Sequence, residues 1–90
     1  MKTFIWDIEK NNLIKKERHV SFEDVILKIQ NQEILDVVDH PDQSKYAGQK
    51  LYIININDYV YIVPFLETSK EIILKTIIPS RKATKKYMKR

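Results

Sequence analysis

Two strongly apolar segments separated by two residues constrain the fold of this chain of 90 residues more than any other feature. Residues 51–56 and 59–65 are rich in Ile, Val and Tyr, which favour β-strands. Asn57 and Asp58 join them, and both residue types tolerate the positive φ angles of a two-residue hairpin. The sequence therefore predicts a central β-hairpin. Pro64 cannot donate to a ladder, so we expect it at a strand end, a bulge or a sheet edge.

Weaker strand patterns flank this hairpin. Residues 34–38 are short and β-branched, and residues 71–78 form the last apolar run. Residues 40–48 are rich in turn-forming types and hold the only glycine of the chain. Near the amino terminus, residues 4–6 predict a short first strand. Four consecutive strands joined by loops and turns indicate an antiparallel sheet.

Capping residues mark the expected start of three helices. Asp7 can cap a helix over roughly 7 to 18. Ser21 and Asp24 have the spacing of a capping box for a second helix, 21 to 31, with one apolar face. Ser80, directly after Pro79, can cap a closing helix. The predicted fold class is α+β, in the order β-α-α-β-β-β-β-α, with an antiparallel sheet and helices packed on one face.

Composition narrows the possible functions. Ninety residues allow a single domain, 1–90, with a modest core. There is no cysteine, so a disulfide scaffold and a thiolate metal site are excluded. The two histidines lack the spacing of a metal site, and we predict neither a metal nor a cofactor. Early charge and short apolar runs argue against a signal peptide and a membrane span, so a soluble cytoplasmic protein is expected.

The main functional signal lies in residues 80–90. They hold six of the sixteen Lys and Arg residues and no acidic residue, whereas the rest of the chain carries ten Lys or Arg and all twelve Asp or Glu. A basic stripe on an acidic body is typical of a protein that binds a polyanion, most often a nucleic acid. The alternative is a solvated basic tail without a specific role.

Four short motifs are similar to those of a known family. They are Phe4-Ile5-Trp6-Asp7, Lys10-Asn11, Val20-Ser21-Phe22-Glu23 and, most specifically, Ile77-Ile78-Pro79-Ser80-Arg81-Lys82-Ala83-Thr84. Together they resemble the BrnT toxins of bacterial toxin–antitoxin pairs, whose fold is like that of the RelE/ParE superfamily. The resemblance implies a compact toxin of the ribonuclease type, which blocks translation and is held inactive by an antitoxin.

The chain also departs from the pattern of that family. Lys-His-Gly is usual where this sequence has Glu17-Arg18-His19, so a catalytic histidine cannot be transferred onto Arg18. An acidic residue is common where Tyr87 stands, and an arginine is common where Lys50 stands.

RNA cleavage without a metal needs a base, an acid and a cation that offsets charge on the phosphate. Arg81 is the first candidate for the cation, because a guanidinium can hold two phosphate oxygens and a helix start favours an anion. A surface ion pair is the alternative for Arg81. Tyr87 could exchange a proton if nearby cations lower its pKa from about 10, but packing on the sheet also explains it. His19, at the end of the first helix, is the third catalytic candidate; a plain surface position is its alternative.

Candidate contacts to an RNA backbone are Lys82, Lys85, Lys86 and Lys89, for which ordinary solvated lysines are the alternative. Lys50 and Lys75 lie on predicted strands and could face a groove between the sheet and the tail. His40 is expected to have a turn or solvent role.

Three functions follow as hypotheses: a toxin-type endoribonuclease, a non-catalytic binding module, and an inhibitor of another target such as gyrase. The expected partners are RNA, free or on the ribosome, and an antitoxin with an acidic or amphipathic segment; no membrane is expected.

Overall fold

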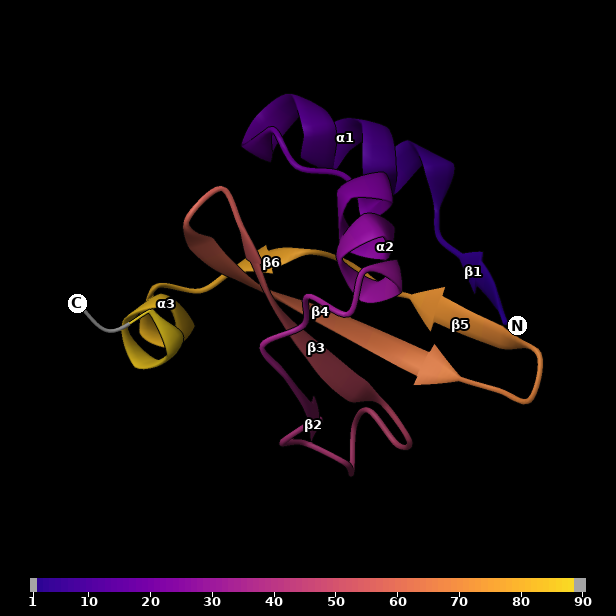
Figure 1. Ribbon diagram of the computed structural model, residues 1–90. Helices are drawn as coiled ribbons and strands as arrows, with labels where there is room; N and C mark the ends of the chain where they lie inside the picture. Colours follow the sequence, from indigo (N-terminus) through magenta and orange to yellow (C-terminus); the bar gives the residue numbers. More distant parts are fainter. Residues whose placement is uncertain (1, 89–90) are drawn as a thin grey trace.

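The computed structural model describes residues 2–88 and has the predicted α+β class and order of elements (Figure 1). The elements are β1 (Thr3–Ile5), α1 (Ile8–Arg18), α2 (Phe22–Gln30), β2 (Asp36–Asp39), β3 (Lys50–Ile56), β4 (Tyr59–Glu67), β5 (Glu71–Leu74), β6 (Ile78–Pro79) and α3 (Arg81–Tyr87). The last predicted strand is split into β5 and β6. Between residues 2 and 88 no helix is long and apolar enough to cross a bilayer.

The six strands form one mixed sheet in the order β1-β5-β4-β3-β2, with β6 paired to β4. All neighbours are antiparallel except β1 and β5, which run parallel. The parallel pair differs from the expected antiparallel sheet. Two helices connect β1 to the next strand, β2, so β1 does not pair with its neighbour in sequence. It lies instead beside a strand about 70 positions later, with Phe4 opposite Ile72. No local pattern in the sequence specifies that pairing.

The predicted hairpin between β3 and β4 is confirmed. Asn57 and Asp58 have φ angles of 54° and 63°, and Ile56 pairs with Tyr59 across the turn. Because side chains alternate along a strand, Tyr52 and Ile54 face one side of the sheet while Leu51 and Ile53 face the other. Both faces of the sheet are therefore apolar, and other elements must pack against each of them.

Helices α1 and α2 cover the first side (Figure 1). The predicted capping box at α2 is confirmed: Ser21 Oγ accepts the Asp24 amide at 3.2 Å, and Asp24 Oδ2 accepts the Ser21 amide at 3.0 Å. It positions Phe22, which is fully buried against the sheet. Asn11 of α1 is also buried; its Oδ1 accepts the Phe22 amide at 2.8 Å and its Nδ2 donates to Glu23 at 2.8 Å. The two helices are thus joined by one side chain.

Helix α3 covers the other side of the sheet. Ala83, Tyr87 and Met88 pack against a second apolar cluster whose strand residues are Leu51, Ile53, Val60 and Ile62. The prediction that helices pack on one face therefore holds for α1 and α2 but not for α3. The physical reason is the continuous apolar run of β3 and β4, which is typical of strands covered on both faces.

Pro64 explains why the last predicted strand is divided. It lies inside β4 opposite Leu51, and its carbonyl accepts the Lys75 amide at 2.8 Å. Because proline has no N–H, the ladder on that side stops, and residues 75–77 leave the sheet before β6 resumes the pairing. Pro64 is therefore not at a strand end, but it does lie beside a break in the neighbouring strand.

Candidate nucleic-acid interface

Helix α3 is fixed to the start of β4 by residues 80–84. Ser80 Oγ caps the helix by accepting the Ala83 amide at 3.0 Å, as predicted, and the Ser80 amide donates to the Val60 carbonyl at 3.0 Å. The Val60 amide in turn donates to Thr84 Oγ1 at 2.9 Å. Ala83, with no side chain beyond Cβ, lets the helix approach the strand and is 8% exposed. These short side chains anchor the helix and leave its longer ones outside.

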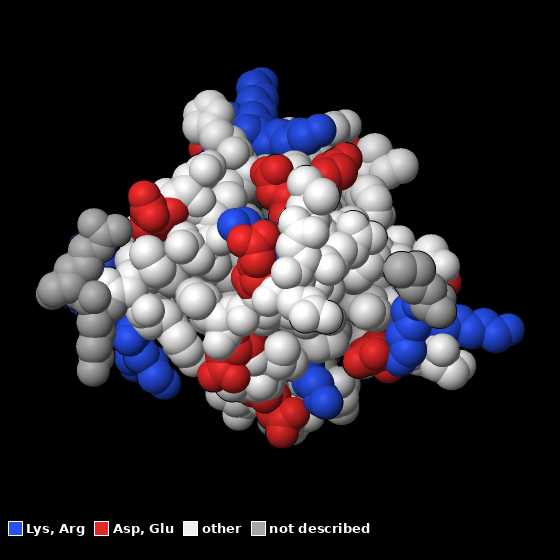
Figure 2. Space-filling view, in the orientation of Figure 1, with Lys and Arg blue, Asp and Glu red and all other residues white. Residues whose placement is uncertain are grey.

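The cations of α3 all lie on the surface. The exposed residues are Arg81, Lys82, Lys85 and Lys86; Lys89 lies outside the described residues. Within residues 2–88 the ion pairs are Lys2–Glu67 at 2.6 Å and Lys28–Glu33 at 3.9 Å, so Arg81 does not form the surface ion pair that was its alternative explanation. Figure 2 shows basic side chains at the left margin, where α3 lies in Figure 1, while acidic side chains occupy the centre of that view.

Tyr87 anchors α3 to the edge strand β2. It packs against the second apolar cluster, and its hydroxyl donates to Asp36 Oδ2 at 2.9 Å. Lys86 Nζ lies 5.4 Å from the ring centroid. The hydrogen bond to Asp36, followed by partial burial, raises the pKa of Tyr87 above its ordinary 10.0. The expectation that neighbouring cations lower this pKa is therefore wrong in direction, which disfavours Tyr87 as a base.

The bond between Tyr87 and Asp36 predicts a pH dependence of stability. Because the folded state raises the tyrosine pKa, the bond stabilises the protein fully below the unfolded value of 10.0 and is lost as the pH rises through the folded value. Replacing Tyr87 with phenylalanine should reduce the loss of unfolding free energy between pH 8 and pH 11, as measured by urea denaturation. Tyr59→Phe is the control, since the Tyr59 hydroxyl makes no hydrogen bond within residues 2–88. Equal alkaline losses in wild type and Tyr87→Phe would contradict this account.

His19 ends α1 in a left-handed conformation. Its φ is 59°, its amide donates to the Lys15 carbonyl at 3.0 Å, and its side chain is exposed. This backbone geometry gives His19 a role in terminating the helix. No contact joins the imidazole to a cation of α3 within residues 2–88, so its catalytic role stays a prediction.

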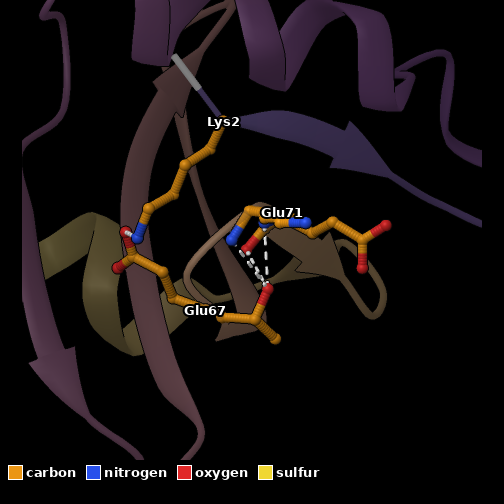
Figure 3. Close-up of polar contacts among 5 residues, drawn as sticks. Lys2, Glu67 and Glu71 are labelled. Atoms are coloured by element: carbon orange, nitrogen blue, oxygen red, sulfur yellow. Dashed lines mark hydrogen bonds and ion pairs between the residues drawn. The ribbon is translucent and has the colours of Figure 1, made fainter.

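Lys50 lies on the face of the sheet opposite α3. It begins β3, and alternation places its side chain on the same side as Tyr52 and Ile54. There it lines a polar hollow together with Lys2 and Glu67, which form an ion pair at the end of β4 (Figure 3). The structure therefore does not bring Lys50 together with Arg81.

A second hollow lies on the same face as α3, and we call it the Pro64 hollow. It is lined by His40, Tyr46, Pro64, Lys75, Thr76 and Ile78. Its volume is about 270 Å³, close to the lower end of small-molecule sites, roughly 300 to 1,000 Å³. Pro64 follows Val60 and Ile62 at alternate positions, which places it on the α3 side of β4. The hollow thus combines an imidazole, a phenol and an ammonium group on the basic side of the sheet.

The loop carrying His40 is held by its own hydrogen bonds. His40 Nδ1 accepts the Asp42 amide at 3.0 Å, and Gln43 Nε2 donates to the His40 carbonyl at 2.8 Å. The imidazole stacks on Tyr46 with ring centroids 4.3 Å apart. The Ser44 hydroxyl, followed by the Lys45 amide, lowers the pKa of Asp42. The turn role predicted for His40 is present, but the sequence did not indicate that this loop and residues 75–78 line one hollow.

Comparisons with protein-family models, with curated proteins and with solved structures gave no match to this chain.

Proposed function

We propose that this chain is a toxin of a bacterial toxin–antitoxin pair, an endoribonuclease that cleaves RNA and so blocks translation. The observation that carries the proposal is the row of exposed cations on α3, which is anchored to β4 and β2 and forms no ion pair within residues 2–88. Cations held on a rigid element lose little entropy on binding a phosphate backbone. Such contacts position a nucleic acid without reading its sequence.

The resemblance to the BrnT toxins supports the same proposal. Several of the residues that carry this resemblance also have identifiable roles in the fold. Residues 77–84 are the most specific part of the resemblance, and within them residues 80–84 dock α3 and leave Arg81 and Lys82 outside. The family usually has glycine where this chain has His19, and His19 adopts the left-handed conformation that glycine favours. The motif positions thus have local structural roles that are consistent with a shared fold.

In the proposed reaction Arg81 offsets charge growing on the phosphate, and the lysines of α3 hold the flanking backbone. An antitoxin segment that is acidic or amphipathic would cover this helix. The neighbouring strand β2 exposes Val38, which is 37% exposed. It lies opposite Leu51 on the α3 side of the sheet and would meet the apolar side of such a segment. The hydrogen bond from Tyr87 to Asp36 places β2 directly beside α3.

The role of α3 is tested by the salt dependence of RNA affinity. Changing Arg81, Lys82, Lys85 and Lys86 together to glutamine should flatten the slope of log K against log salt by about 3, because each single-strand phosphate contact contributes about 0.7. Fluorescence anisotropy with a labelled single-stranded RNA gives both slopes. The matched control changes lysines 15, 16, 28 and 70, which belong neither to α3 nor to the lining of the Pro64 hollow, and it removes the same charge. Equal effects of the two variants would overturn the role of α3.

Catalysis is tested separately, by expression and by incubation with RNA. Wild type should arrest growth and cleave RNA, alone or with translating ribosomes, and Arg81→Ala should do neither. No cleavage in either setting, with no growth arrest, would overturn the endoribonuclease. Salt-sensitive binding without products would then favour a non-catalytic RNA-binding module. A supercoiling assay separates both from a gyrase-type inhibitor.

A further inference from the structure

We infer that the Pro64 hollow is a nucleotide-binding subsite, which takes one unstacked nucleotide of a single-stranded RNA. The base lies on the His40–Tyr46 pair, and Lys75 pairs with the phosphate. The inference rests on the proposed function only for the identity of RNA as the polymer; the subsite itself is carried by the geometry of the hollow.

The hollow and the basic helix are continuous along the chain. Ile78 lines the hollow and Arg81 begins α3, so their Cα atoms are at most about 10 Å apart over three residues. Both lie on the same face of the sheet, since Pro64 shares the side of β4 that packs under α3. An RNA strand held by the cations of α3 can therefore place its next base in the hollow without crossing the sheet.

The His40–Tyr46 pair supplies a surface for stacking. The two rings are tilted by 31° with centroids 4.3 Å apart, and both side chains are only partly buried. Unstacked bases of single-stranded RNA are recognised mainly by stacking on aromatic side chains. The Gln43 side chain braces the loop that carries the pair: its Nε2 donates to the carbonyls of His40 and Gln49 at 2.8 Å and 3.0 Å, and its Oε1 accepts the Gly48 amide at 3.0 Å.

The hydrogen bond at His40 also fixes which ring nitrogen can contact the ligand. The Asp42 amide donates to Nδ1, so the proton of the neutral imidazole is assigned to Nε2. Within residues 2–88, Nε2 has no hydrogen-bond partner. In this tautomer His40 is a donor, suited to an oxygen of the nucleotide rather than to removing a proton. We therefore assign His40 to binding and not to general-base catalysis.

Lys75 provides the charge. Its amide is held by the Pro64 carbonyl at 2.8 Å, which fixes the backbone from which the exposed ammonium group extends. Its ammonium forms no ion pair within the described residues. A phosphate is therefore the group that this position can pair with, while the aromatic pair takes the base.

The test uses the full chain and adenosine 5′-monophosphate as the probe, with adenosine and inorganic phosphate as separate arms. Backbone amide signals of Tyr46, Gln49 and Thr76 should shift with the nucleotide, more weakly with adenosine, and not with phosphate at the same concentration. Equal shifts with phosphate alone, or no shifts with the nucleotide, would overturn the subsite.

Matched variants separate the contribution of the two aromatic rings to nucleotide binding from that of the Lys75 ammonium group. His40→Asn keeps the turn, because an asparagine oxygen accepts the amide two residues on, and should weaken nucleotide binding about tenfold through loss of the ring. Tyr46→Ala should weaken it similarly, whereas Tyr46→Phe should not. Lys75→Gln should weaken binding of the nucleotide but not of adenosine. Unchanged affinity in His40→Asn and Tyr46→Ala would overturn the assignment.

The subsite and the proposed function fail in different ways. If the hollow is correct, His40→Asn lowers RNA affinity without changing the salt slope, whereas the α3 variant changes the slope. Shifts at the hollow in a protein that cleaves no RNA would retain the subsite and remove the nuclease. RNA cleavage by a protein whose amide signals at the hollow do not shift with the nucleotide would retain the nuclease and remove the subsite.

Discussion

Replacing Phe22 with alanine is expected to lower the free energy of unfolding by about 3–5 kcal/mol. The side chain is 0% exposed and packs within the first apolar cluster, with the Trp6 ring centroid 6.4 Å away. Its removal leaves a cavity between α2 and the sheet. Domains of this size are stable by only about 5–15 kcal/mol, so the variant should lose a large share of its stability. Urea denaturation followed by circular dichroism measures the change.

The control for Phe22 is another apolar residue of α2. Leu27 is 57% exposed, and Leu27→Ala should change the unfolding free energy by no more than about 0.5 kcal/mol. Similar losses in the two variants would show that α2 is not held mainly by its buried face.

Asn11→Ala is expected to have the next largest effect. The side chain is 4% exposed, and its loss leaves the buried Phe22 amide without its acceptor, which costs about 1–3 kcal/mol. Asn12→Ala is the control, since Asn12 is the exposed neighbour on the same helix. A loss equal to that of the control would mean that water replaces the link between α1 and α2.

The same substitution should also change the pH dependence of stability. The Asn11 side chain is the first cause that holds the pKa of Glu23 below its ordinary 4.5. A depressed folded pKa gives stability that is present above the unfolded value and is lost as the pH falls through the folded value. The difference in unfolding free energy between wild type and Asn11→Ala should therefore become smaller below about pH 4.5.

Asn11→Asp should show this effect most clearly. An aspartate keeps the acceptor for Phe22 but sets a second carboxylate against Glu23, which is 2.8 Å from the present amide. The free energy of unfolding of Asn11→Asp should fall below that of wild type by more at pH 7 than at pH 3.5, because the carboxyls take up protons at the lower pH. A deficit that grows toward acid would contradict the proposed contact.

The local features of the fold were predictable because their signals lie within a few residues. Asn57-Asp58 specified the hairpin, and the caps at Asp7, Ser21 and Ser80 specified all three helix starts. The non-local features were not. Parallel pairing of β1, the Asn11 link and the raised pKa of Tyr87 each join segments that the sequence does not place together; Tyr87 and Asp36 are 51 positions apart.

The candidate site also has features that the sequence predicts and features that it does not. The exposure of the α3 cations was predictable from a basic run after a cap. The side of the sheet that α3 covers did not, although the apolar residues at successive positions of β3 indicate a strand that is covered on both faces. The Pro64 hollow could not be predicted from local sequence, since it combines the His40 loop with Pro64 and with residues 75–78, which lie far along the chain.

The break in the strand beside Pro64 also provides attachment points for α1. Residues 75–77 lie between β5 and β6, and the carbonyls of Lys75 and Ile77 accept hydrogen bonds from Lys10 Nζ at 3.1 Å and Arg18 Nη1 at 2.9 Å. Only Asn11 and Ile14 of α1 are buried, so these two polar contacts contribute much of its attachment. Two of the positive charges of the chain are thereby committed within the molecule, to backbone carbonyls at the break in the strand that runs beside Pro64.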